Sequence, residues 1–130
     1  MRYLLSIYGD ESQMDAVPAD SVREMSDAYA TFTAELREAG AMVGGDALQP
    51  TATATTVRVR DGERLLTDGP FAETREQLGG FYLVECADLD EALDWAARIP
   101  GAAHGSIEVR PVMEFAPGGE QTASDAAATA

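Results

Sequence analysis

The sequence predicts an α+β fold of the ferredoxin-like type, in which an antiparallel sheet carries two helices on one face. Apolar extended segments and two amphipathic segments follow one another in the order strand, helix, strands, helix, strand, which is the split βαβ order. The chain has 130 residues, enough for one domain with a real core. Hydrophobic residues make up 45% of it, as in an ordinary globular protein.

The chain opens with a strand and a helix. Residues 2–8 are mostly apolar or aromatic, which predicts a buried strand, and the polar residues 11–19 are expected to form a surface connection. The first helix is predicted to begin near Ser21, because Ser21 and Glu24 have the spacing of a capping box, and to end at Gly40. Its apolar stripe, at steps of three and four, consists of Val22, Met25, Tyr29, Phe32 and Leu36.

The middle of the chain predicts three strands, two of them joined as a hairpin. Residues 41–48 contain glycines, which favours a short, kinked strand. Residues 51–60 are dominated by Thr and Val, and within them Val57 and Val59 are expected to face a buried side. The Asp-Gly dipeptide at 61–62 predicts a type I′ turn, which requires positive φ at both central positions, so the chain should return as a strand directly after it.

The last third predicts the central strand, the second helix and the final strand. Residues 81–85 are almost wholly apolar, which suits a strand in the middle of a sheet. The second helix is expected to begin at Asp88, which forms a capping pair with Glu91. Residues 106–115 predict the last strand, and Pro111 favours an edge position because proline cannot donate to a ladder.

The charge balance limits the classes of partner. With 9 basic and 23 acidic side chains, the formal net charge is -14, so neither nucleic acid nor an anionic membrane surface is an expected partner. No apolar run approaches the roughly 20 residues that span a bilayer, and the first residues do not resemble a signal peptide, so a cytoplasmic location is expected. The single cysteine, Cys86, excludes an intrachain disulfide and a cysteine-based zinc site, and we expect it to be a buried, inert thiol. Neither a metal nor another cofactor is expected.

Two helices can cover only one face of the predicted sheet. The strand at 81–84 is apolar on both sides, so the second face also requires cover, and we expect a homodimer in which two sheets face each other. The domain is predicted to span residues 1–116. Residues 117–130 contain no large apolar side chain and are expected to form a flexible tail.

One long connection carries the most specific pattern in the chain. Residues 68–83 read Asp-Gly-Pro-Phe-Ala-Glu-Thr-Arg-Glu-Gln-Leu-Gly-Gly-Phe-Tyr-Leu, and this run resembles the signature of the YCII-related, DGPF-domain family. The flanking residues 54–62 and 108–111 are also similar to that family, so the resemblance covers roughly residues 1–115. It implies a ferredoxin-like subunit that assembles as a dimeric α/β barrel.

The resemblance also implies two kinds of function. The wider superfamily includes small cofactor-independent enzymes, such as muconolactone-isomerase-like proteins and dehydrochlorinases. Many DGPF-domain proteins are encoded beside extracytoplasmic-function sigma factors, which implies a regulatory setting. A related YCII branch has a proposed His-Asp pair with its histidine in the first helical region, whereas the one histidine of this chain is His104.

Five residues are the candidates for a functional site: Asp68, His104, Arg75, Phe71 and Glu73. The first four each have a structural alternative. Asp68 either acts as a general base or only hydrogen-bonds the turn that it begins. His104 is of the residue type most used for proton transfer near neutral pH, or is a plain exposed loop residue. Arg75 either grips a carboxylate with two parallel hydrogen bonds or pairs with Glu73 or a partner subunit. Phe71 either lines the pocket or anchors the loop to the core.

Two functions are consistent with these candidates. The first is a dimeric module that binds a small ligand or regulates a partner, with Arg75, Phe71 and Glu73 in contact with a small anionic organic ligand. The second is a cofactor-independent isomerase or lyase that acts by proton transfer on a small organic acid, with Asp68 and His104 as the acid–base residues. The sequence has no dedicated nucleophile, metal cluster or phosphate loop, which slightly favours the first.

Overall fold

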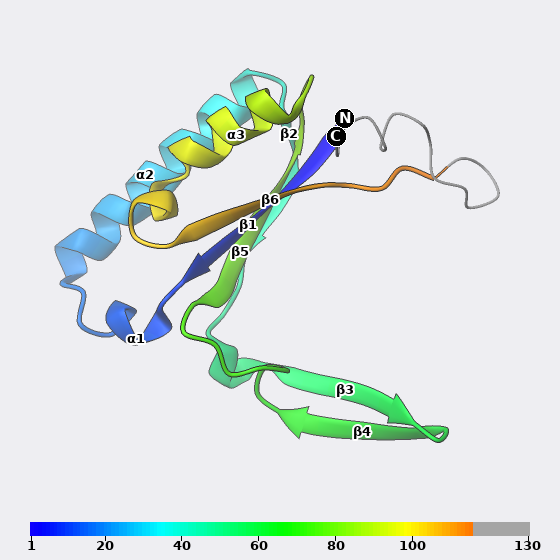
Figure 1. The fold of residues 1–130 in the computed structure, drawn as a ribbon. Helices are drawn as coiled ribbons and strands as arrows, with labels where there is room; N and C mark the ends of the chain where they lie inside the picture. The colour runs from blue at the N-terminus through cyan, green and yellow to red at the C-terminus, as the bar shows by residue number, and fades with distance from the viewer. Residues whose placement is uncertain (116–130) are drawn as a thin grey trace.

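The computed structural model describes residues 1–115, and within them a four-stranded antiparallel sheet has the order β2-β5-β1-β6. The strands are β1 (Arg2–Gly9), β2 (Met42–Ala47), β5 (Gln77–Glu85) and β6 (Ser106–Pro111). Helices α2 (Ala19–Glu38) and α3 (Leu89–Arg98) both cover one face of this sheet (Figure 1). This arrangement is the ferredoxin-like α+β subunit that the sequence predicts.

The core lies between this sheet and the two helices. β1 is central: Leu5 lies opposite Tyr82 of β5 on one side and Val109 of β6 on the other. β5 runs between β1 and β2, so its predicted interior position is confirmed. The largest fully buried side chains, none more than 1% exposed, are Tyr3, Leu5, Leu36, Val84 and Ile99.

Aromatic side chains join the helices to the sheet and to each other. The ring of Phe32 from α2 meets that of Tyr82 edge-on at 5.1 Å and that of Trp95 from α3 at 6.0 Å between centroids. The guanidinium of Arg98 lies 4.5 Å from the centre of the Trp95 ring and also pairs with Glu35 of α2. These contacts fix α3 against α2 on the covered face.

Two helix ends follow a local sequence signal, at Gly40 and Asp88, and a third, at Ser21, does not. Gly40 follows α2 with a φ of 74°, the left-handed conformation that glycine adopts most readily. Asp88 caps α3 by accepting a hydrogen bond from the Glu91 N–H at 2.9 Å, as predicted. The predicted capping box at Ser21 is wrong, because α2 begins two residues earlier, at Ala19, after the extended backbone of Pro18.

The connection over residues 11–19, expected to be irregular, contains the one-turn helix α1 (Glu11–Met14). The carboxylate of Asp10 accepts a hydrogen bond from the Ser12 N–H at 2.9 Å and so caps this turn. α1 thus follows β1 directly and turns the chain toward the start of α2 (Figure 1).

Strands β3 (Thr55–Arg60) and β4 (Glu63–Asp68) form a separate two-stranded hairpin, which we call the arm. The predicted turn is confirmed, since Asp61 and Gly62 have φ values of 54° and 78°. The predicted burial of Val57 and Val59 is wrong for a single chain: they are 56% and 61% exposed. The reason is that β3 pairs only with β4 and, among the elements within residues 1–115, no other covers the arm, which projects away from the main sheet (Figure 1).

The sheet face opposite the helices is called here the open face. Because side chains alternate along a strand, those that do not point into the core point to this face. It includes Leu4, Ser6, Phe81, Leu83, Glu108 and Arg110, which lie side by side in the register, and Asp46 of β2, which lies opposite Phe81. Its apolar members are half-buried in the single chain.

Two further expectations concern the rest of the chain. The tail predicted over residues 117–130 lies outside the described residues. Within residues 1–115 no helix combines the length and the apolar character that crossing a membrane requires.

Candidate functional site

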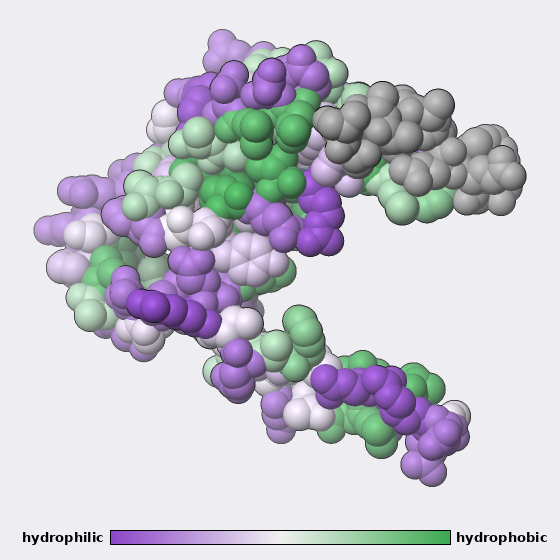
Figure 2. Space-filling view, in the orientation of Figure 1, coloured by the Kyte–Doolittle hydropathy of each residue, from purple (hydrophilic) through white to green (hydrophobic). Residues whose placement is uncertain are grey.

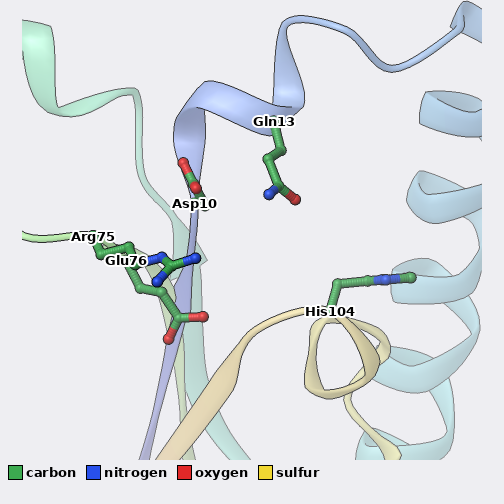
Figure 3. A pocket seen from close by; sticks show the side chains of 5 residues that line it. All are labelled: Asp10, Gln13, Arg75, Glu76 and His104. Carbon is green, nitrogen blue, oxygen red and sulfur yellow. The ribbon is translucent and has the colours of Figure 1, made fainter.

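A cavity of about 530 Å³ lies where β1 ends and β5 begins, at one end of the main sheet. Its lining residues come from three parts of the chain (Figure 3): the turn after β1, the loop before β5 and the turn before β6. They are Asp10, Gln13, Arg75, Glu76 and His104. The cavity therefore joins two of the five residues singled out from the sequence, Arg75 and His104.

Asp10 is held in place by the residue that it caps. Its Oδ1 accepts hydrogen bonds from the hydroxyl of Ser12 at 2.5 Å and from the Ser12 N–H at 2.9 Å. These two bonds, with a smaller contribution from the positive charge of Arg75, hold the pKa of Asp10 below its ordinary value against a small opposing effect of burial. Asp10 is therefore a fixed carboxylate that faces Arg75.

The loop before β5 is held by hydrogen bonds along its length. Glu76 accepts a bond from the Ser106 hydroxyl at 2.8 Å through its carboxylate and one from the Thr74 hydroxyl at 2.6 Å through its backbone carbonyl. Gln77 donates its side-chain amide to the carbonyl of Thr74. These bonds tie the segment that carries Arg75 to the first residue of β6.

Glu11 links the same region to the base of the arm. Its carboxylate accepts hydrogen bonds from the N–H of Thr51 at 2.9 Å and from the Thr51 hydroxyl at 2.7 Å, and Thr51 begins the 3-10 helix η1 (Thr51–Thr53). The Glu11 N–H in turn donates to the side chain of Gln77 at 2.9 Å. α1, η1 and the start of β5 thus form one connected frame around the cavity.

Arg75 supplies the positive charge of the cavity. Its side chain is exposed, and among residues 1–115 no carboxylate forms an ion pair with it. Figure 3 shows its guanidinium beside Asp10 and Glu76. The predicted pairing with Glu73 is therefore not formed in the single chain, and the guanidinium keeps donors available for a ligand.

His104 lines the cavity from the opposite side. It follows the 3-10 helix η2 (Pro100–Ala103), and its N–H donates to the carbonyl of Gly101 at 3.1 Å. Figure 3 shows its imidazole directed away from Asp10 and Arg75. His104 is exposed, and a role in proton transfer remains a prediction.

The other three candidates lie outside the cavity lining. Asp68 is the exposed last residue of β4, beside a turn that is held by a bond from the Gly69 N–H to the carbonyl of Ala54 at 2.7 Å. Glu73 is also exposed. Phe71 is 80% exposed, so its predicted role as an anchor to the core is wrong for a single chain. The ligand-binding and catalytic roles of these residues stay predictions.

Three of the lining residues, Asp10, Gln13 and Glu76, are not among the five site candidates predicted from the sequence. A local signal existed for Asp10, since an aspartate directly after a strand and two residues before a serine is typical of a capped turn. Gln13 lies on the turn that this cap begins. Glu76 lies within the family signature, but its neighbourhood depends on Ser106, thirty residues further along the chain.

Two other features of the described residues bear on chemistry: potential metal ligands and the single thiol. Within residues 1–115 no group of three His, Cys, Asp or Glu side chains is placed to hold a metal ion. Cys86 is a buried free thiol at the end of β5, and burial, followed by the negative charge of Glu91, raises its pKa to about 11. A thiol of this kind is a poor nucleophile near neutral pH.

Comparison with known proteins identifies relatives over almost the whole chain. The family model described as the YCII-related domain matches residues 1–116. An uncharacterized protein of Rhizobium meliloti (strain 1021) is 42% identical over 120 residues, which cover 91% of this chain and 97% of the relative.

Proposed function

Because the chain belongs to the YCII-related family, we propose that it is a dimeric module that binds a small organic acid in the cavity beside Arg75 and has a regulatory role. The observation that carries this proposal is the exposed guanidinium of Arg75, which has no ion-pair partner among the described residues and faces a cavity of about 530 Å³. An arginine in this position matches a carboxylate with two parallel hydrogen bonds.

The neighbours of Arg75 narrow the class of ligand. Asp10 and Glu76 place two carboxylates beside the guanidinium (Figure 3), so a ligand with several negative charges is repelled. A ligand that carries one carboxylate together with an ammonium or hydroxyl group can satisfy the arginine and donate to an acid at the same time. We therefore place small hydroxy or amino acids ahead of dicarboxylic acids.

The proposed dimer follows from the open face. Leu4, Phe81 and Leu83 lie next to one another on a sheet face that neither helix covers. Burial of such a face against a second copy removes apolar surface from water and gives a closed, symmetric assembly. The uncovered apolar face therefore supports the facing-sheet arrangement that the family resemblance implies.

The ligand proposal is tested by comparing Arg75→Ala with Arg23→Ala. Arg23 lies on exposed α2, outside the cavity, so both changes remove one positive charge but only the first removes the proposed anchor. We expect Arg75→Ala to weaken the binding of a small hydroxy or amino acid at least about tenfold, as for the loss of a charge-assisted hydrogen bond. The measurement is native mass spectrometry for a co-purified ligand, followed by calorimetric titration with a panel of small acids.

Arg23→Ala should bind as the unaltered protein does. Equal weakening by both variants would show that the effect is the net charge rather than the cavity. If the unaltered protein retains no ligand and binds no member of the panel, the ligand-binding form of the proposal is wrong, and regulation through a protein partner is left.

A second candidate function, a cofactor-independent isomerase or lyase, is favoured by one observation: His104 lines the same cavity as Arg75. In this proposal His104 exchanges a proton with an organic acid that Arg75 holds, and Asp68, which lies outside the cavity lining, is the second acid–base candidate. Asp68→Asn and His104→Gln should each lower turnover by about 100-fold or more if they are the acid–base pair. Retention of full activity by Asp68→Asn would remove Asp68 from the mechanism.

A further inference from the structure

The arm carries an apolar face that nothing else within residues 1–115 covers. Val57 lies opposite Leu66 in the β3–β4 register, so both point to the same side of the arm as Val59. These three side chains are 56%, 60% and 61% exposed, and every residue of β4 is exposed. Figure 2 shows hydrophobic surface gathered along the arm.

An arm of this kind is unusual for a protein that remains a single copy in water. A two-stranded hairpin is marginally stable alone, and its outer strand edges are free to pair or aggregate. Yet the turn at Asp61 and Gly62 and the bonds at the base, where Thr56 donates to the carbonyl of Gly69 at 2.9 Å, define the hairpin well. Exposed apolar residues on a defined element indicate an interaction surface.

The position of the arm indicates what it contacts. It leaves one end of the main sheet and runs to the side away from α2 and α3, the side of the open face (Figure 1). The space-filling view shows a hollow between the arm and the body of the protein (Figure 2). A partner that covers the open face is therefore also within reach of the arm.

The charge distribution indicates that this partner is a second copy of the chain. The arm has three arginines and three acidic residues over residues 55–68, so the whole net charge of -14 lies elsewhere. The open face also carries little net charge: Arg110 pairs with Glu108 at 2.7 Å, and Asp46, opposite Phe81, adds one negative charge. A basic partner would be drawn to the acidic helices, whereas two acidic copies meet with least repulsion through these two surfaces of low net charge.

We propose that the arm of each copy packs its Val57, Val59 and Leu66 face against the body of a second copy, so that each protomer of the dimer is clasped by the arm of the other. This inference rests on the proposed dimer and adds the element that holds it together. The contact is symmetric, since each copy gives one arm and receives one. It accounts for a face that is apolar, exposed and distant from its own core.

The test compares Leu66→Ser with Leu65→Ser by sedimentation velocity of the full chain over a range of concentrations. The two leucines are neighbours on β4 but point to opposite sides of the arm, since Leu65 lies opposite Arg58. We expect Leu66→Ser to raise the dimer dissociation constant at least about tenfold, and Leu65→Ser to change it less than about twofold. Both residues are exposed in one chain, so neither change should unfold the domain.

Hydrogen exchange of residues 55–68 provides an independent measurement. Their amides should be protected at concentrations where the dimer forms and should exchange quickly where it dissociates. If the unaltered protein is a monomer throughout, the proposed dimer itself is wrong. If it is a dimer, yet Leu66→Ser dimerises equally well and the arm exchanges quickly in the dimer, the clasp alone is overturned and the facing-sheet dimer stands. If the amides of residues 55–68 become protected only when an unrelated protein is added, the arm binds that protein, and the proposal that it binds a second copy is wrong.

Discussion

Gly105 packs so closely against the backbone of Tyr8 that a methyl group at residue 105 would overlap the carbonyl oxygen of Tyr8. Gly105 lies between His104 and Ser106, the first residue of β6, and Ser106 lies opposite Tyr8 in the β1–β6 register. The same close approach that begins the β1–β6 ladder therefore places His104 at the cavity.

The first prediction concerns this contact. Gly105→Ala should lower the free energy of unfolding by about 1–3 kcal/mol, because the added carbon meets backbone that cannot move without separating the two strands. The matched control is Gly9→Ala, since an added carbon there has no atom within 4 Å. Urea unfolding followed by circular dichroism measures both. Equal midpoints for the two variants would show that the strands tolerate the extra carbon.

The second prediction compares the two helix starts. Asp88→Ala should destabilise the protein by about 0.5–2 kcal/mol, because the Asp88 carboxylate accepts the hydrogen bond that caps α3. Ser21→Ala should change stability by less than about 0.5 kcal/mol, because Ser21 lies inside α2 rather than at its cap. Thermal unfolding of both variants at one pH distinguishes them. A larger loss for Ser21→Ala would restore the capping box that the sequence suggested.

These two helix starts show why local patterns predict some features and not others. At Asp88 the pattern agrees with the structure: β5 ends at Glu85, and Asp88 itself has the extended backbone of a cap residue. At Ser21 the same pattern competes with Pro18, whose fixed φ and extended backbone begin the helix earlier. A capping pattern thus predicts that a helix begins nearby, and the preceding residue decides where.

The sequence predicts the burial of a strand's side chains only where it also predicts the neighbouring strands of that strand. The alternation of β1 and the apolar run of β5 give the four-stranded sheet and its covered face correctly, since both strands lie inside it. Val57 shows the same alternation but belongs to a hairpin that leaves the sheet, so in one chain it stays exposed. Whether such a face is covered depends on assembly, which alternation does not encode.

The cavity likewise combines a residue that the sequence predicts with neighbours that it does not predict. Arg75 was identifiable because the signature run concentrates polar side chains before a buried strand. Arg75 and Glu76 lie near Asp10 because β1 pairs with β5. Glu76 bonds to Ser106 because β6 begins beside the same end of the sheet. Such long-range neighbourhoods follow from strand order and register rather than from spacing in the sequence.

The third prediction concerns pH. Two bonds from Ser12, together with the charge of Arg75, lower the pKa of Asp10 in the folded protein, so its carboxylate stabilises the fold above the unfolded pKa, and this contribution is lost as the pH falls through the folded pKa. The difference in Tm between the unaltered protein and Asp10→Ala should therefore be largest near neutral pH and shrink in acid. Calorimetric scans across this pH range measure it.

A charge control is available for Asp10 on α2. Asp27→Ala also removes one negative charge, from an exposed position on the helix. The difference in Tm between the unaltered protein and Asp27→Ala should not shrink in acid as it does for Asp10→Ala. If the difference in Tm between the unaltered protein and Asp10→Ala stays constant from neutral to acid pH, the hydrogen bonds from Ser12 do not depend on the ionisation of the Asp10 carboxyl.

The fourth prediction concerns Cys86, whose pKa is raised from 9.0 to about 11 by burial and then by the charge of Glu91. At pH 8 the fraction of reactive thiolate should be about a hundredfold smaller in the folded protein than in the unfolded chain. Alkylation by iodoacetamide should be slower by at least that factor in the native state, since the side chain is also buried. The measurement is mass spectrometry of the modified fraction over time, with and without denaturing urea.

The same shift has a consequence for stability. The pKa of Cys86 is higher in the folded protein than in the unfolded chain, so the unfolded chain loses the thiol proton first as the pH rises. The contribution of the protonated thiol to the free energy of unfolding is therefore complete below pH 9 and is lost as the pH rises toward about 11. The variant Cys86→Ala lacks this group and should lose less stability than the unaltered protein over that interval. Tyr29, whose pKa is also raised by burial, is present in both proteins, so its effect cancels in the comparison. Parallel losses in the two proteins would mean that Cys86 is more open to water than its burial beneath the helices indicates.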